Sequence, residues 1–353
     1  MRHVFGTGFA LLALAVLQSA AVEATTIKFP LPEGTTGLSI TRPSTNTCFD
    51  FPHGDVAGTY FTAGGSAGHS YGFIRSCDGT FTTIDVNSYD HHTTVETIDN
   101  AGDVAGQYED KNNPDVWHAF VRTPDGTITS FDGPGAYNTF PSDLVQYANP
   151  PLVTLGWYYT ADGVHGFRRA PDGTFTTIDY PGAVATYPST GRFWEDSGGG
   201  FYQIAGAYDD ATGRRHGLYT SYGHDHPMLR TLDPPDSTYT GNVWDGDGRG
   251  GLGGVYRDGA GVWRGFFYEQ RKFYPIDQPI SRVNTRNEAV GQTTKFRYLH
   301  GRIKFTKEVD PPHGCYNLSL AGINNRTSMS GTMQCGKSGA WFGYLVRRAH
   351  TSP

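Results

Sequence analysis

Apolar residues recur at every second position in short runs along this chain, and Gly, Asn, Asp and Pro separate the runs. Alternation of this kind predicts β-strands. Apolar residues at helical spacing are rare after the first 24 residues. One stretch shows the arrangement clearly, because Asp- and Gly-bearing turns separate its segments. The four strands predicted there are Thr93–Ile98, Asp103–Tyr108, Trp117–Arg122 and Thr127–Asp132.

The four-strand phrase repeats along the chain roughly every 40 to 50 residues, which is typical of a β-propeller blade. A glycine in the second strand anchors each copy, and an aspartate follows the fourth strand. The anchoring glycines are Gly58, Gly106, Gly156, Gly206, Gly254, Gly291 and Gly331. The closing aspartates are Asp85, Asp132, Asp179, Asp233, Asp277 and Asp310. The last copy therefore lacks its fourth strand.

The N-terminal segment offers that missing strand. Thr25–Pro30 is similar in sequence to the fourth-strand phrase Thr82–Asp85, and the chain ends soon after the third strand at Tyr344–Val346. Pairing the two ends would remove the exposed edge of an open ring. We therefore predict an all-β fold: a seven-bladed β-propeller of four-stranded antiparallel blades, in which the N-terminal strand closes the last blade.

The first residues have the features of a secretory signal peptide. Arg2 and His3 precede an apolar run, Phe9–Leu17, and an A-x-A-like site, Val22–Ala24. We expect residues 1–24 to be removed and residues 25–353 to form one secreted or periplasmic propeller domain. The apolar run is too short for a comfortable membrane span, so no membrane span is expected.

The cysteines and the net charge indicate disulfides and limit the classes of partner that the protein could bind. Four cysteines in an exported chain suggest two disulfides, and loop-closure entropy favours the local pairs Cys48–Cys77 and Cys315–Cys335. Their spacing does not match a zinc site, and no metal site is predicted. The net charge of -6, without a basic stripe, argues against nucleic-acid binding. We expect a monomer.

Several phrases resemble the HAF-repeat family of bacterial extracellular proteins. They are His118–Phe120, His165–Phe167 and Thr174–Ala183. The resemblance covers nearly all of the mature chain, strongest from Asp55 to Ala183, and implies an exported, propeller-like protein. It brings no defined activity. The later copies depart from the phrase, with His216–Leu218, Arg264–Phe266 and Phe342–Tyr344 in place of His-Gly-Phe.

The recurrent histidines His118, His165 and His216 could form a ring of metal ligands or bases. A structural role is the favoured interpretation, because repeats share structural solutions. Each imidazole would then bond to neighbouring backbone or to a carboxylate of the adjacent blade. The loops Tyr208–Gly213 and Arg257–Gly261 could bind a structural calcium ion, although they lack the EF-hand pattern and their Asp and Gly also suit turns. No other cofactor is expected.

Chemistry is better sought where the repeat breaks down, in the crossings from one blade to the next. These share a face with the loops between second and third strands. Tyr, His, Trp and Arg there can stack on sugars and pair with carboxylates. The candidates are Tyr89, His91, His92, Tyr137, Tyr187, Tyr239, Trp244, Arg282 and Arg286.

Two functions fit this set. The first is a polysaccharide lyase that cleaves uronate-containing glycans by β-elimination. Arg282 or Arg286 would neutralise the uronate, His91 or His92 would take the proton, and Tyr137 or Tyr187 would protonate the leaving oxygen. Tyr89, Tyr239 and Trp244 would bind substrate.

The alternative is a non-catalytic secreted propeller that binds a glycan or a protein through the same face. A glycosidase is a third interpretation, which would need two carboxylates at the mouth, such as Asp90 with Glu195 or Asp196. The lyase interpretation is an analogy at the level of the fold and does not rest on a shared motif.

Overall fold

The computed structural model has only β-strands among the residues it describes, and no helix. No described segment forms a helix long and apolar enough to cross a membrane. The described residues are 25–41, 43–44, 54–63, 68–86, 92–146, 152–196, 199–222, 227–245, 251–284, 286–299, 302–324 and 326–347. The predicted signal peptide lies outside them.

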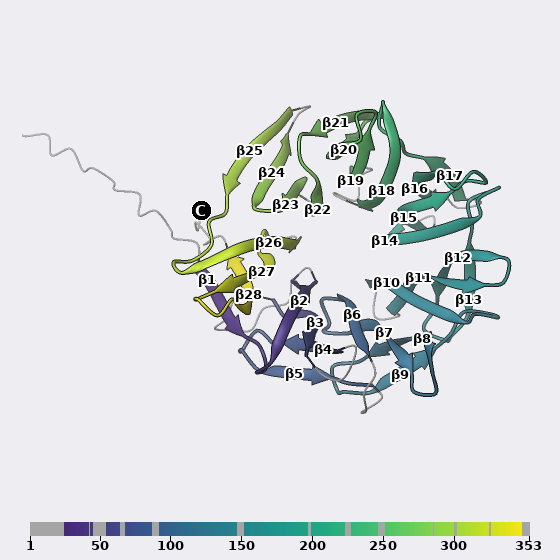
Figure 1. Cartoon of the computed structure of the whole chain (residues 1–353). Coiled ribbons are helices and arrows are strands. Elements are labelled where there is room, and N and C mark those ends of the chain that lie inside the picture. The colour runs from purple at the N-terminus through teal and green to yellow at the C-terminus, as the bar shows by residue number, and fades with distance from the viewer. Residues whose placement is uncertain are drawn as a thin grey trace, which may run out of the picture.

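Four sheets are separate four-stranded antiparallel blades, arranged in a ring (Figure 1). The first contains β2 (Thr35–Ile40), β3 (Val56–Thr62), β4 (His69–Arg75) and β5 (Phe81–Ile84). Another contains β18 (Ser237–Asp245), β19 (Leu252–Asp258), β20 (Trp263–Glu269) and β21 (Lys272–Ile276). The third contains β22 (Ile280–Val283), β23 (Glu288–Gly291), β24 (Thr294–Leu299) and β25 (Arg302–Glu308).

The fourth of these sheets joins the two ends of the described chain, as the sequence predicted. It contains β1 (Thr25–Pro30), β26 (Cys315–Ile323), β27 (Met329–Cys335) and β28 (Ala340–Arg347). The N-terminal strand β1 pairs antiparallel with β28 along its whole length, from Thr25↔Arg347 to Pro30↔Phe342. Phe29 of β1 is 4% exposed and belongs to a core cluster that includes Phe73 of β4. The N-terminal strand therefore packs into the junction between the last sheet and the first.

The remaining twelve strands form one sheet, where the prediction expected three separate blades. They fall into three four-strand groups. The first group is β6 (Thr93–Ile98), β7 (Val104–Asp110), β8 (Asn113–Arg122) and β9 (Ile128–Phe131). The second is β10 (Asn138–Gln146), β11 (Leu152–Thr160), β12 (Gly163–Arg169) and β13 (Phe175–Ile178). The third is β14 (Ala185–Asp196), β15 (Gly199–Asp209), β16 (Arg215–Tyr222) and β17 (Pro227–Thr231).

Two short parallel contacts join these groups, and they explain why separate blades are not seen here. Asn138 pairs with Trp117, and Ala185 pairs with Val164. The Asn138 side chain also accepts a hydrogen bond from the Trp117 amide at 2.6 Å. Each crossing is thus pinned to the third strand of the group before it. The prediction of seven separate four-stranded blades is wrong for this part of the chain.

The anchoring glycines mark a close approach of strands. Gly156 lies directly opposite Phe167, whose side chain is fully buried. A Cβ on Gly156 would lie 2.8 Å from the Phe167 ring and even closer to the carbonyl oxygen of Phe140. Gly106 and Phe120 repeat the arrangement, with the ring 2.9 Å from where a Cβ would be. The repeated glycine is therefore a packing requirement of the sheet.

One predicted disulfide, Cys315–Cys335, is present and ties the start of β26 to the end of β27. Cys77 is also disulfide-bonded. Its predicted partner, Cys48, lies outside the described residues.

Candidate functional site

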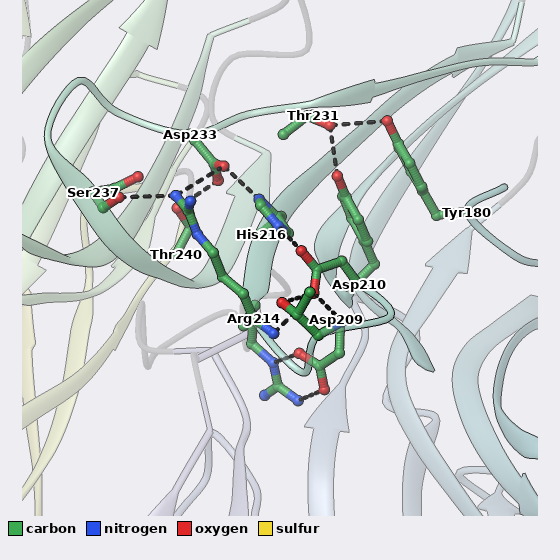
Figure 2. Close-up of polar contacts among 12 residues, drawn as sticks. Tyr180, Asp209, Asp210, Arg214, His216, Thr231, Asp233, Ser237 and Thr240 are labelled. Carbon is green, nitrogen blue, oxygen red and sulfur yellow. Dashed lines mark hydrogen bonds and ion pairs between the residues drawn. The ribbon is translucent and has the colours of Figure 1, made fainter. Parts of the chain in front are cut away.

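The recurrent histidines are held inside their own four-strand groups. His216 Nδ1 lies 2.6 Å from Asp233, the closing aspartate, and Nε2 lies 3.1 Å from Asp210 in the β15–β16 turn (Figure 2). Arg214 donates to the Ser237 carbonyl at 2.9 Å and lies 3.9 Å from Asp233. The histidine therefore fastens the end of one strand to the turn between two others.

We call this arrangement the clamp: a third-strand side chain held between the closing aspartate and an aspartate at the turn between the second and third strands. It recurs at equivalent positions. His118 lies 2.9 Å from Asp132 and 3.4 Å from Asp110. His165 lies 2.8 Å from Asp179. In the β18–β21 sheet an arginine replaces the histidine, and Arg264 bonds to Asp258 and Asp277 at 2.6 and 3.0 Å. These contacts support the structural interpretation, but the prediction of adjacent-blade partners is wrong: each closing aspartate comes from the group that contains its histidine.

The clamp also sets charge states. Burial alone would lower the pKa of His216, but hydrogen bonds to Asp233 and Asp210 outweigh it and the pKa is raised. A side-chain hydrogen bond from Thr212, followed by the one from His216, holds the pKa of the Asp210 carboxyl well below its usual range. Hydrogen bonds to Asp179 and Asp162 likewise raise the pKa of His165, so the clamps at His165 and His216 favour an imidazolium between two carboxylates.

A tyrosine stack completes the clamp beside His216. The Tyr208 ring stacks on the His216 ring with centroids 5.0 Å apart, and Tyr180 stacks on Tyr208 at 3.8 Å. Both tyrosine hydroxyls hydrogen-bond to Thr231, as Figure 2 shows. Burial raises the pKa of Tyr208 to about 12. These groups are satisfied within the scaffold.

The turn aspartates that suggested calcium are engaged in the same way. Asp210 accepts hydrogen bonds from the amides of Thr212 and Arg214. Asp258 accepts them from the amides of Ala260 and Val262. Among the described residues, no group of His, Cys, Asp and Glu side chains has the arrangement of a metal site. The described residues therefore supply no set of calcium ligands in these loops.

Aromatic side chains form a continuous row on the face that carries the crossings and the turns between second and third strands. We call this row the aromatic belt. Trp117 lies 6.5 Å from Phe140, and Phe140 lies 6.1 Å from Trp157, centroid to centroid. The belt contains His92, Trp117, Tyr137, Phe140, Trp157, Tyr159, Tyr187, Arg215, Tyr239 and Trp263.

Arg215 links the Tyr187 and Tyr239 rings within the belt. Its guanidinium lies 4.2 Å from the Tyr187 ring centroid and 5.8 Å from that of Tyr239. Asp209 fixes it in place through two hydrogen bonds of 2.7 and 2.8 Å. A cation stacked on a ring and tied to a carboxylate is a rigid polar element within an apolar surface.

Two belt rings are the most open to solvent. Tyr137 is 50% exposed and Trp263 is 45% exposed. Val184 and Val262, which precede β14 and β20 on the same face, are 50% and 46% exposed. Exposed apolar side chains that gather in a patch on one face, rather than lying singly, are typical of interaction sites. This face combines exposed rings and aliphatic side chains with the fixed Arg215–Asp209 pair.

The structure brings four of the candidates from the sequence into the belt: His92, Tyr137, Tyr187 and Tyr239. His92 hydrogen-bonds to Ser70 at 3.0 Å, and its ring lies 6.3 Å from that of Trp117. Burial raises the pKa of Tyr187 to about 12, although Arg215 acts against the shift. Trp244 is only 8% exposed and belongs to a core cluster.

The two candidate arginines lie elsewhere. Arg282 stands 5.6 Å from the Trp244 ring. It also interacts electrostatically with Glu96 of β6, which puts both side chains towards the centre of the ring. Arg286 follows β22 in the β22–β23 turn, at the end of the strand opposite to the crossing. Tyr89 and His91 lie outside the described residues.

Six of the ten belt residues are not among the candidates from the sequence: Trp117, Phe140, Trp157, Tyr159, Arg215 and Trp263. Trp117, Arg215 and Trp263 each come immediately before the clamp residue of the third strand, and Phe140 is the third residue of an innermost strand, as Tyr187 and Tyr239 are. A register count within the repeat could have found them. The composition of the loops alone does not identify these residues.

No protein-family model matches the sequence, and no curated protein matches it either. Solved structures are similar in fold. The β-propeller domain of the Trilobed protease from Pyrococcus furiosus is 10% identical, with a TM-score of 0.52, and the match covers 90% of this chain and 99% of that one. This chain is a β-propeller.

Two larger proteins match over part of their length. A puromycin hydrolase is 12% identical with a TM-score of 0.54, and the match covers 86% of this chain and 51% of that one. The acylaminoacyl peptidase of Pyrococcus horikoshii is 9% identical with a TM-score of 0.50, covering 91% and 54%. The chain thus spans about half the length of each. At these identities the similarity shows the fold alone.

Proposed function

We propose that this protein is a secreted propeller that binds extracellular carbohydrate through its aromatic belt. The belt itself is the observation that carries the proposal. A sugar has an apolar C–H face and a polar hydroxyl edge, and a row of rings that includes one fixed Arg–Asp pair can match both. The propeller scaffold would hold these side chains in fixed positions, which lowers the entropic cost of binding.

Lyase activity has weaker support than binding. Among the described residues, the contacts of His92 are to Ser70, Glu109 and Trp117, and so include neither an arginine nor a tyrosine. A tyrosine with its pKa raised to about 12, such as Tyr187, is a poor proton donor to a leaving oxygen. Binding without catalysis is therefore the form of the proposal that the geometry favours.

The proposal includes three further predictions from the sequence: the number of blades, export and family membership. We count each four-strand group of the twelve-stranded sheet as one blade, because single residue pairs join the groups, and this gives a seven-bladed ring in one domain. A disulfide supports export through the predicted signal peptide, since disulfides persist in oxidising compartments. Membership of the HAF-repeat family would explain why His118 and His165 form the same clamp.

Binding to a panel of insoluble and soluble polysaccharides tests the proposal. The variant Tyr137→Ala removes a half-exposed belt ring, and Ile128→Ala is its matched control. Ile128 is 38% exposed at the start of β9, at the opposite end of the strands. Binding that weakens for Tyr137→Ala and not for Ile128→Ala supports the proposal. Absence of binding to every glycan overturns it.

A second assay separates binding from catalysis. The protein is incubated with uronate polysaccharides, and absorbance from new C4–C5 double bonds is followed. We expect no signal. A signal that is lost in His92→Ala or Tyr187→Phe would restore the lyase interpretation.

A further inference from the structure

The charge around the aromatic belt narrows the kind of glycan, if the proposed function is correct. Each turn between second and third strands along the belt carries a carboxylate: Asp110, Asp162, Asp210 and Asp258. The closing aspartates add further carboxylates on the same face. Asp110, Asp162, Asp210 and Asp258 with the closing Asp132, Asp179, Asp233 and Asp277 make eight carboxylates, against the four clamp residues His118, His165, His216 and Arg264 that lie between them.

The arginines that border the belt are engaged by the protein. Arg215 is bonded to Asp209 through two nitrogens. Arg214 donates to the Ser237 carbonyl, and Arg257 donates to the Gly261 carbonyl at 2.9 Å. A uronate is recognised by arginines that direct two donors at its carboxylate, and Arg215, the guanidinium within the belt, already directs its Nε and Nη2 donors at Asp209.

Lys111 adds little positive potential. It is exposed in the β7–β8 turn, and Asp110 and Asp115 lie close to it in the sequence. A chain of uronates placed along the belt would therefore meet a field of its own sign, and like-charge contact opposes association.

We infer that the belt binds a neutral polysaccharide, with Tyr137 and Trp263 as its principal stacking platforms. These are the two most exposed rings of the belt. Tyr137 immediately precedes β10 and Trp263 begins β20, and the β14–β17 group lies between the β10–β13 group and the β18–β21 sheet in the ring (Figure 1). A neutral chain gains stacking from both rings without facing electrostatic repulsion.

The experiment compares a neutral and an anionic polymer in the same assay. The full mature chain is titrated with hydroxyethyl cellulose and with polygalacturonate at low and at physiological salt. We measure Trp263→Ala and Tyr137→Ala beside the control Ile128→Ala. We expect binding to the neutral polymer that is insensitive to salt and about tenfold weaker in each belt variant.

A charge variant gives an independent readout. Asp115→Lys adds positive charge beside the belt at an exposed position. We expect it to gain affinity for polygalacturonate, most clearly at low salt, and to bind the neutral polymer as before.

The outcomes separate the two proposals. Tighter, salt-sensitive binding of the wild-type chain to polygalacturonate would overturn the neutral-glycan inference and leave glycan binding standing. Binding to neither polymer, nor to any glycan of the wider panel, would overturn both. Equal losses in Ile128→Ala and the belt variants would also contradict the inference, because the platforms would then have no special role.

Discussion

Closure of the ring by the N-terminal strand can be tested at one side chain, Phe29. Its ring is 4% exposed, packs over Gly343 and lies 6.4 Å from the Phe73 ring. Replacing a buried Phe by Ala removes its transfer free energy and leaves a cavity, and typically costs about 3–5 kcal/mol. We expect Phe29→Ala to lower the free energy of unfolding by that amount, measured by urea denaturation with tryptophan fluorescence.

Lys28 provides the matched control on the same strand. It is exposed, and its ammonium lies 3.9 Å from the Phe342 ring centroid. An exposed cation–π contact contributes about 0.5–1 kcal/mol, so Lys28→Ala should have a small effect. If Phe29→Ala cost no more than Lys28→Ala, the N-terminal strand would not stabilise the junction and the reasoning would be refuted.

Three other outcomes follow from the structure. Gly156→Ala should destabilise the protein by about 1–3 kcal/mol in the same denaturation assay, because the new Cβ meets the Phe167 ring; an unchanged midpoint would contradict the packing argument. The raised pKa of His216 gives stability that is full below the unfolded-state value of about 6.5 and is lost as pH rises through the folded-state pKa. The fall in unfolding free energy above that pH should therefore be smaller in His216→Gln; an identical profile would sink the idea. Replacing Cys315 and Cys335 together by Ser opens a loop with a sequence separation of 20 and should cost about 3 kcal/mol, checked against the wild type with and without reductant.

The sequence predicted the fold because its information is local and repeated. In the stretch Thr93–Asp132, the predicted strands agree with β6–β9 to within a few residues. Period-two alternation and turn residues act over a few positions, so they can be recognised without knowing what lies beside them. The separation into blades depends instead on contacts between groups. Asn138 contacts Trp117 only in the folded chain, and the repeat pattern does not predict that pair.

The candidate site was predicted by residue type and placed correctly only in part. Tyr137, Tyr187 and Tyr239 were found because they interrupt the repeat in the crossings. Trp244 and Arg286 were assigned to the same kind of crossing, yet one is buried in the core and the other lies at the far end of its strand. Burial and the end of the strand at which a side chain lies are properties of the packed ring.

The sequence by itself determined the strand order, the anchoring glycines, the closing aspartates and the pairing of the two chain ends. All of these follow from repetition and from local turn chemistry. Only the tertiary structure decided that His216 bonds to its own closing aspartate, and that Trp117, Arg215 and Trp263 join the crossing tyrosines in one belt. The physical reason is distance: the belt residues come from different strands and groups, and side-chain contacts between them exist only once neighbouring sheets have packed in register.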